Sequence, residues 1–248
     1  MFEGNDARHP LVRDNVRQGG YVAATASGLR LVRTGDVPDL PRQTRARRLQ
    51  FVLKRAMDLI VATCALVTFS PLLICVAVLI KMTSTGPVII RQERYGRDGR
   101  IFDVYKFRTM YFDRGDPAGV EQAVPNDPRV TPVGRYIRRS SIDELPQLIN
   151  ILKGEMSLVG PRPHPVGMRA AGVLYEDLVP YYHLRHAVVP GLSGWAQVNG
   201  LRGPTVDPVL ARSRVDHDLA YIQNFSLWLD FKIILLTLRY EFLAGSGD

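Results

Sequence analysis

The sequence has few of the residues that covalent or metal cross-links require. Its only cysteines, Cys64 and Cys75, lie in one apolar run, which excludes a disulfide framework. The five histidines form no HExxH pair or similar ligand spacing, and we therefore predict no structural transition metal. A secretory apolar segment near the start is also lacking. The fold must then depend on a packed core, which a hydrophobic content of 46% can supply.

Acidic residues are outnumbered, because 32 lysines and arginines stand against 24 aspartates and glutamates. The net charge of +8 suits nucleic acid, an anionic membrane surface or phosphate-rich substrates. A nucleic-acid-binding protein is expected to carry a recognisable binding motif and no uncharged run of bilayer length, and this sequence shows the reverse. We therefore predict no nucleic-acid partner. Residues 1–48 are predicted to be a poorly ordered basic leader.

From Leu59 to Ile80 no residue is charged. As a helix this run would be about 33 Å long, roughly the hydrocarbon thickness of a bilayer. Ser70 and Pro71 lie at its middle, where proline kinks a helix and serine can bond a freed backbone group. Both flanks are basic, so both ends can lie in the cytoplasm. We predict a re-entrant membrane helix over 49–82, with an ordinary spanning helix as the alternative, and an interfacial Arg55–Asp58 pair or two solvated charges at its mouth.

Beyond the run, residues 83–248 are predicted to form a compact cytoplasmic catalytic domain at the membrane surface. Strand patterns around the turn 96–99 predict a small β-hairpin over 87–110. A helix is predicted over 140–153, and residues 221–243 suit either an interfacial amphipathic helix or a core helix. The predicted fold class is α+β, with the re-entrant helical hairpin and interfacial helices as anchors.

The segment Ser140–Leu148 holds the candidate chemistry. Ser141 and Glu144 have capping-box spacing, whereas Asp143 as the cap would put Pro146 in a tolerated first-turn position. In both interpretations two carboxylates lie at a helix N-terminus, an end that also attracts phosphate. The surrounding basic residues predict either a solvated basic face or a diphosphate site that uses arginines and a carboxylate-bound metal: Arg129, Arg135, Arg138, Arg139, Lys153 and Arg162.

Five short motifs then follow one another in order. They are Lys106–Met110, Asp127–Thr131, Asp143–Gln147, Gly160–Pro163 and Gly194–Gly200. Together, after a basic-flanked apolar run with Ser-Pro, they closely resemble the bacterial sugar transferase family, the monotopic polyprenyl-phosphate phosphoglycosyl transferases. The resemblance covers about residues 50–245. The part from His186 to Asp230 is most similar to members that transfer glucose-1-phosphate to undecaprenyl phosphate for exopolysaccharide synthesis.

The resemblance implies a two-step mechanism through a covalent intermediate. The aspartate matching Asp143 attacks the sugar-bearing phosphorus of a UDP-sugar, UMP leaves, and the lipid phosphate then takes the phosphosugar. Glu144 is implied to hold Mg²⁺, and Arg138, counted with Asp143 and Glu144 among the catalytic residues, is implied to bind phosphate or the nucleotide. The implied substrate-binding residues are Lys106, Arg108, Arg129, Pro161, Arg162 and Pro163. Ser70 and Pro71 match the family's helix break.

The resemblance also implies partners and a location. The partners are a UDP-sugar, undecaprenyl phosphate and lipids of the bacterial inner membrane, with the catalytic domain on the cytoplasmic face; a homodimer is an open alternative. The chain is similar to the short, catalytic-only form, but Val189 and Ser193 depart from the usual basic residue and threonine, which leaves galactose or an N-acetylated sugar open beside glucose. An inactive membrane scaffold is the alternative function, and the intact Asp143–Glu144 pair argues against it.

Two further residues receive an interpretation from sequence. Trp195 is interpreted as a packing residue rather than a platform for sugar stacking. His164, next to Pro163, is interpreted as an exposed loop histidine, with a place at the nucleotide site as the alternative.

Overall fold

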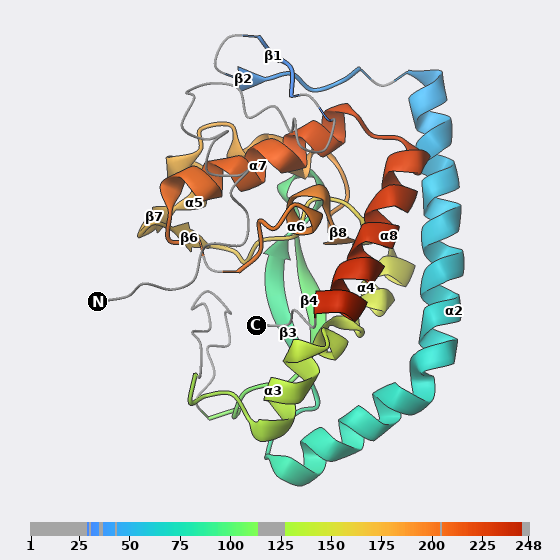
Figure 1. Cartoon of the computed structure of the whole chain (residues 1–248), viewed down its shortest axis with the longest axis vertical. Helices are drawn as coiled ribbons and strands as arrows, with labels where there is room; N and C mark the ends of the chain where they lie inside the picture. The colour runs from blue at the N-terminus through green and yellow to red at the C-terminus, as the bar shows by residue number, and fades with distance from the viewer. Residues whose placement is uncertain are drawn as a thin grey trace.

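A computed structural model describes residues 29, 31–34, 37–42, 44–113, 127–203 and 205–244. The chain forms a mixed α+β fold in which one long helix runs along the side of a compact body, while a β-hairpin lies at the centre (Figure 1). The α+β prediction is confirmed at this level. Of the predicted leader, residues 1–28 lie outside the described part. Its later part includes two strands of two residues each, β1 (Arg33–Thr34) and β2 (Val37–Pro38), which pair antiparallel.

The long helix, α2, spans Arg45–Thr83 without interruption. Thr44 caps its start by accepting from the backbone N–H of Arg47 at 3.2 Å. Pro71 lies inside the helix, and α2 changes direction in its second half (Figure 1). Proline lacks the N–H that would reach the carbonyl of Val67, and the hydroxyl of Ser70 donates to that carbonyl instead, at 2.8 Å. The predicted rescue of a freed backbone group is confirmed, but the structure has one bent helix where a helical hairpin was predicted.

Three charged residues near the start of α2 attach it to the body. Arg55 donates to the carbonyls of Ile151 and Leu152, and the carboxylate of Asp58 accepts from the backbone N–H of Leu158 at 3.0 Å. Both predictions for Arg55 and Asp58 are therefore wrong, because each side chain finds a partner about a hundred residues away. Lys54 forms a buried ion pair with Asp230 at 2.6 Å.

The predicted β-hairpin is confirmed. Strands β3 (Ile89–Tyr95) and β4 (Ile101–Phe107) pair antiparallel, with the 3-10 turn η1 (Arg97–Gly99) between them. Asp98 has φ +56° and Gly99 φ +73°, the left-handed conformations that close such a turn. The register sets Ile90 opposite Lys106, so their side chains share one face of the hairpin.

The predicted helix over 140–153 is broken. Helix α3 (Pro132–Arg139) ends before Ser141, whose φ of +53° is left-handed, and the 3-10 turn η2 (Ile142–Glu144) precedes α4 (Gln147–Lys153). Neither predicted cap forms: Ser141 makes no side-chain capping bond, and Pro146 stands at the cap of α4. The two carboxylates therefore lie in a short turn between helices rather than at a helix N-terminus.

The C-terminal half contains the largest core. The helix predicted over 221–243 is present for most of its length as α8 (Leu227–Ala244), and its first three residues instead end α7 (Pro208–Gln223). Trp195 is 1% exposed in this core, which confirms its interpretation as a packing residue. The smaller elements around it are β5 (Ser157–Val159), β6 (Arg169–Ala170), β7 (Val173–Leu174), α5 (Tyr175–Leu178), η3 (Tyr182–Ala187), β8 (Gly191–Ser193) and α6 (Trp195–Val198).

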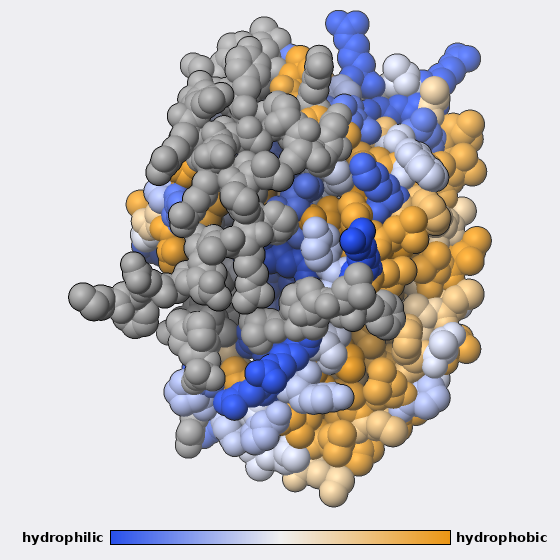
Figure 2. All heavy atoms as spheres, viewed as in Figure 1, coloured by the Kyte–Doolittle hydropathy of each residue, from blue (hydrophilic) through white to orange (hydrophobic). Residues whose placement is uncertain are grey.

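Apolar side chains remain exposed along the side formed by α2 and α8 (Figure 2). Only 11% of the most apolar stretch of α2 is buried, and within the described residues α2 is the one helix long and apolar enough to cross a membrane. On α8 the exposed set is Trp228, Phe231, Leu235 and Leu238. A continuous apolar side of this kind is typical of contact with lipid or with another protein.

Candidate active site

A cavity of about 880 Å³ lies between the β3–β4 hairpin, η2 and the C-terminal half. Ten basic side chains and only three carboxylates line this cavity. The basic residues are Arg91, Arg94, Lys106, Arg108, Arg129, Arg138, Arg162, Arg185, Arg202 and Arg214, and the acidic ones are Asp143, Glu144 and Asp218. Such an excess of positive charge in a concave site favours a ligand with several negative charges.

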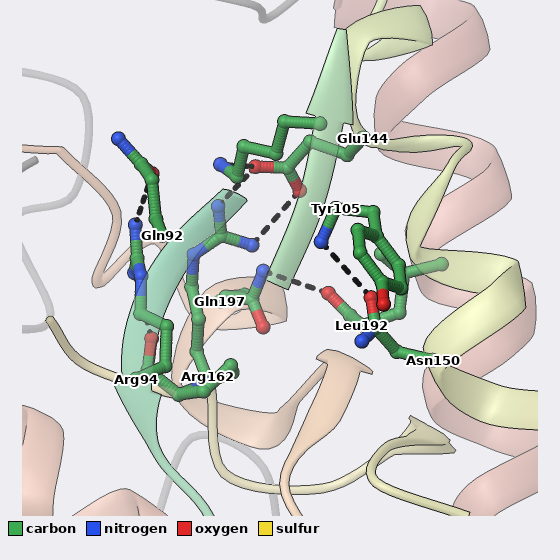
Figure 3. Close-up of polar contacts among 10 residues, drawn as sticks. Gln92, Arg94, Tyr105, Glu144, Asn150, Arg162, Leu192 and Gln197 are labelled. Carbon is green, nitrogen blue, oxygen red and sulfur yellow. Dashed lines mark hydrogen bonds and ion pairs between the residues drawn. The ribbon is translucent and has the colours of Figure 1, made fainter. Parts of the chain in front are cut away.

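Glu144 is the centre of the charged cluster (Figure 3). Its Oε1 accepts from Nζ of Lys106 at 2.7 Å, and Arg162 donates to both of its oxygens, with Nη1 at 3.0 Å from Oε2. Burial alone would raise the pKa of Glu144, but Arg162 and Lys106 together hold it well below its usual range. The carboxylate of Glu144 is therefore ionised at neutral pH.

Asp143, the adjacent residue, behaves in the opposite way. Its burial, followed by the negative charge on Glu144, raises its pKa to about 6, although Lys106, Arg138 and Arg162 oppose this shift. Among the described residues, no hydrogen bond reaches its carboxylate. Asp143 is thus a desolvated carboxylate whose lone pairs are available, which is the condition of a nucleophile or a general base.

The backbone that carries Arg162 is fixed by close contact between two strands. β5 and β8 pair in parallel, and a Cβ on Gly191 would lie 2.0 Å from the backbone nitrogen of Gly160. Only glycine permits that approach. Pro161 is buried there, and its carbonyl accepts a hydrogen bond from the backbone N–H of Gly191 at 3.0 Å. The carbonyl of Pro163 accepts a hydrogen bond from the guanidinium of Arg94 at 2.8 Å. The two prolines therefore position Arg162, and of the two only Pro163 lines the cavity.

Three other predicted residues line the cavity in different ways. Arg108 is buried and donates to the carbonyls of Pro87 and Ser84, so its guanidinium ties β4 to the end of α2. Arg129 forms an ion pair with Asp127 at 2.7 Å. Arg138, on α3, lies beside Asp143 and lowers its pKa. The structure thus brings Lys106, Arg138, Asp143, Glu144 and Arg162 together, with Arg108 and Arg129 at the margin.

Sequence analysis missed several residues of the cavity. Arg94, on β3, is half-buried, and its desolvation followed by the charge of Arg162 lowers its pKa to about 10, so it remains a cation at neutral pH. Arg185 pairs with Asp218 at 2.6 Å and also donates to the carbonyl of Arg162 at 2.7 Å. Arg214, on α7, also lines the cavity. Arg94 gave no signal in the sequence, because β3 also holds the charged residues Arg91 and Glu93.

His164 was also misread from sequence. It is 3% exposed, lines the cavity, and its Nδ1 lies 3.1 Å from the hydroxyl of Tyr182. Burial first, and then the charges of Arg185 and Arg214, hold its pKa well below the usual range. It is therefore a neutral histidine in the cavity wall rather than an exposed loop residue.

The carboxylate pair suits a magnesium ion only in part. Mg²⁺ in proteins commonly binds one or two carboxylates and completes its shell with water and substrate phosphate oxygens. Asp143 and Glu144 supply two carboxylates, and Oε2 of Glu144 accepts only one hydrogen bond from the residues described above. Within the described residues no group of three or more potential ligand side chains gathers. The site therefore fits Mg²⁺ when substrate oxygens contribute ligands.

Comparison with known proteins gives a consistent result. Residues 49–243 match the profile of the family described as Bacterial sugar transferase. An exopolysaccharide production protein of Rhizobium leguminosarum bv. phaseoli is 51% identical over 199 residues, which cover 80% of this chain and all of that protein. A UDP-glucose:undecaprenyl-phosphate glucose-1-phosphate transferase of Escherichia coli (strain K12) is 49% identical over 215 residues, covering 86% of this chain.

A further relative carries a different sugar in its name. It is a UDP-N-acetylgalactosamine-undecaprenyl-phosphate N-acetylgalactosaminephosphotransferase of Aeromonas hydrophila, 46% identical over 195 residues, which cover 79% of this chain. The chain spans about half or less of the two named transferases, 46% of the Escherichia coli protein and 44% of the Aeromonas protein.

Proposed function

The chain belongs to the bacterial sugar transferase family, and on that premise we propose that it transfers a sugar-1-phosphate from a UDP-sugar to undecaprenyl phosphate. Glucose-1-phosphate is the proposed group, because a relative named for it is 49% identical to this chain. The exopolysaccharide production protein, matched over its whole length, supports a place at the first step of exopolysaccharide or related glycoconjugate synthesis. This function agrees with the one predicted from sequence.

The observation that carries the proposal is the pair of neighbouring carboxylates whose pKa values are shifted in opposite directions. In the first displacement, an oxygen of Asp143 attacks the phosphorus that bears the sugar. The bond from that phosphorus to the bridging oxygen breaks, UMP leaves with the electron pair, and an aspartyl phosphosugar remains. With a pKa of about 6, most Asp143 is ionised at neutral pH, and the lack of hydrogen bonds leaves the attacking oxygen free.

An anionic nucleophile and an anionic diphosphate repel each other, and the cavity's cations offset that repulsion. Arg162 and Lys106 already hold Glu144, so they form a fixed positive group beside the reacting phosphorus. Arg94 and Arg138 add charge from β3 and α3. Mg²⁺, when bound at Glu144, would supply further neutralisation of the diphosphate.

In the second displacement, an oxygen of the lipid phosphate attacks the same phosphorus. The bond to Asp143 breaks, its carboxylate is regenerated, and a polyprenyl diphosphate sugar is released. Division into two steps lets a water-soluble donor and a membrane lipid use one site in turn.

The attachment of α2 supports a re-entrant position in the bacterial inner membrane, with the catalytic domain on the cytoplasmic face. Near its start, Arg47 donates to the carbonyl of Ile222, and beyond its end Ser84 accepts from Arg108. Both ends of α2 thus contact one body with a charged interior, which does not enter hydrocarbon. A helix that crossed the bilayer would carry one of those ends to the opposite side. The bend at Ser70–Pro71 supports a helix that enters and leaves by the same face.

The function is tested by the intact mass of the protein after incubation with UDP-glucose and Mg²⁺, without lipid, while UMP is assayed. We expect a phosphohexose adduct and stoichiometric UMP, both lost in Asp143→Asn although that variant stays folded. An adduct with another UDP-sugar but none with UDP-glucose would keep the mechanism and change the substrate. No adduct or UMP with any nucleotide sugar would favour the scaffold alternative.

Membrane position is tested with single cysteines at Arg48 and Thr83, both exposed, in a background where Cys64 and Cys75 are serine. An impermeant thiol reagent added to intact spheroplasts should label neither position, and should label both after lysis. Labelling of one position in intact spheroplasts would indicate a spanning helix.

A further inference from the structure

Part of the cavity lining, the apolar branch, carries no charged side chain, in contrast to the wall around Glu144. Its lining side chains come from five separate parts of the chain: Val61 of α2, Leu145 after η2, Leu158 of β5, Leu192 of β8, and Ile234 and Leu238 of α8. These residues lie in the same cavity as Asp143 and Arg162. The site therefore joins a strongly cationic part to a part that offers no charge.

The boundary between the two parts falls at the reacting group. Leu145 follows Glu144 directly, so the apolar lining begins one residue beyond the carboxylate pair. Leu145, Leu158 and Leu192 pack on a small core that includes Ala62 of α2. The floor of the apolar branch is thus built against the same helix that carries the uncharged run.

Two lining residues of the branch reach the surface, one on α2 and one on α8. Val61 is 40% exposed and Leu238 is 48% exposed, while both line the cavity. The hydroxyls of Ser193 and Thr237 lie 2.5 Å apart and join β8 to α8 in this wall. Val61 and Leu238 belong to α2 and α8, the helices whose exposed apolar residues form one side of the molecule in Figure 2. The apolar lining therefore includes residues of that side as well as Leu145, which follows the carboxylate pair.

We propose that this branch binds the isoprene units nearest the phosphate of the lipid acceptor, with α2 and α8 as its two walls. The proposal rests on the proposed function and adds to it the path of the acceptor. A polyprenyl phosphate has one anionic end and one apolar end, and the cavity has one cationic and one apolar part in the same order. Hydrocarbon in the branch stays out of water while the phosphate reaches the cations.

The other substrate does not suit the branch. A nucleotide sugar carries hydroxyls and an amide-like base, and burial of such groups without hydrogen-bond partners costs free energy. Among the described residues, the polar side chains at the branch are few. They are Ser193 and Thr237, whose hydroxyls bond each other, and Gln197, whose amide donates to the carbonyl of Leu192 at 3.4 Å. The donor's polar groups are matched instead by the arginines of the charged part.

The test separates the two half-reactions in variants that fill the branch from either wall. Leu238→Trp and Val61→Trp place a bulky side chain in the apolar lining. Their matched controls are Leu235→Trp and Ile60→Trp, which change the same helices at residues 50% and 64% exposed that do not line the cavity. The first half-reaction is measured as UMP release and adduct mass without lipid. The second is measured as loss of the preformed adduct when undecaprenyl phosphate in detergent is added.

We expect both lining variants to form the adduct at the wild-type rate and to pass it to subsaturating acceptor at least about tenfold more slowly, the effect of losing one buried apolar contact. The controls should match wild type in both steps. Leu238→Ser removes an apolar lining side chain without adding bulk. It should also form the adduct at the wild-type rate and transfer it more slowly, and it serves as the test if a tryptophan variant folds poorly.

Any other outcome would contradict the proposed binding of the lipid acceptor in the branch. Slower adduct formation in the lining variants would assign the branch to the donor. Equal effects in lining and control variants would assign the change to general contact with detergent or lipid. Unchanged transfer in all variants would show that the acceptor lies elsewhere. Failure of the wild-type protein to form any adduct would instead reject the proposed function itself.

Discussion

Asp143 and Glu144 are neighbours in sequence and in space, yet their environments separate them. Glu144 is held by Lys106 and Arg162, whereas Asp143 has burial and the charge of Glu144 acting against its ionisation. Lys106 and Arg162 thus make their hydrogen bonds to Glu144, and in the proposed mechanism Asp143 supplies the attacking oxygen. Two residues of the same chemical type can divide the roles of fixed anion and nucleophile in this way.

The pKa of Asp143 predicts an acid limb in the first half-reaction. A pKa raised to about 6 means that Asp143 becomes protonated, and loses its nucleophilic oxygen, as pH falls through that value. We expect the rate of adduct formation to rise with pH and to reach half its maximum near pH 6. Single-turnover measurements from pH 4.5 to 8 check this. A limb near the ordinary carboxyl pKa of about 4 would contradict it.

Two substitutions should move that limb in opposite directions. Glu144→Gln removes a negative charge that raises the pKa of Asp143, so the residual activity should titrate at lower pH. Arg138→Gln removes a positive charge that lowers this pKa, so the limb should move to higher pH. The rate of residual adduct formation, measured against pH, gives the midpoint of the acid limb for each variant and for the wild type. Shifts in the same direction would mean that the charges act on another group.

At the scale of elements, α3 positions the carboxylate turn through close contact with the hairpin. A Cβ on Gly134 would lie 2.0 Å from the carbonyl oxygen of Thr109, so α3 rests directly on the backbone that follows β4. Thr131 caps α3 and its N–H donates to the same carbonyl at 2.9 Å. This contact fixes the distance between Lys106 on β4 and Glu144 beyond α3.

Gly134→Ala should therefore be far more damaging than its size suggests. The added methyl meets backbone, which has little room to move, and we expect a loss of about 3 kcal/mol in the free energy of unfolding. Gly99→Ala is the matched control, because Gly99 has φ +73° but open space around it, and should cost only about 1 kcal/mol. Chemical denaturation in detergent measures both. Equal losses would show that α3 can shift away from Thr109.

The elements differ in how far sequence predicts them, and the cause is the range of the interactions. The β3–β4 hairpin follows from alternation and a glycine turn within about twenty residues, and the bond from Ser70 to Val67 follows from local helix geometry. The break in the helix at Ser141 was not predicted, because Ser141 and Glu144 also have the spacing of a capping box. Its left-handed backbone is set by packing on either side.

In the candidate site too, the residues that could be predicted from sequence are those that lie in short local motifs. The carboxylate pair and Arg162 stand in short motifs that sequence identifies. Arg94 and Arg185 were missed because each enters the cavity through contacts between distant segments, such as the bond from Arg185 to the carbonyl of Arg162. Nothing in the local sequence distinguishes such an arginine from a solvated one.

At the scale of the whole molecule, a buried polar network fastens the membrane helix to the body. Lys54 and Asp230 pair at 2.6 Å with 8% and 0% of their side chains exposed, and the hydroxyl of Tyr221 donates to the other oxygen of Asp230 at 2.7 Å. Three helices, α2, α7 and α8, thus meet at one carboxylate. Because the cost of burying these charges offsets much of their attraction, the network serves to fix the arrangement of helices.

Asp230→Ala should destabilise the protein strongly, by about 3–5 kcal/mol, because it leaves Lys54 as a buried cation without its partner. The double variant Lys54→Met with Asp230→Ala removes that unpaired charge and should recover most of the loss. Thermal unfolding in the same detergent compares the two. A double variant no more stable than the single one would show that Lys54 reaches solvent when its partner is removed.

The separation of these partners along the chain has a consequence for biosynthesis. Asp230 is 176 residues beyond Lys54, and at 5–20 residues per second the ribosome needs about 9–35 s to reach it. The carbonyls for Arg55 and the N–H for Asp58 also come about a hundred residues later. During that interval the nascent apolar helix is exposed to lipid while the groups that will hold it do not yet exist. In the proposed membrane position, the helix alone therefore determines how it first enters the bilayer, and the body can close on it only after α8 has left the ribosome.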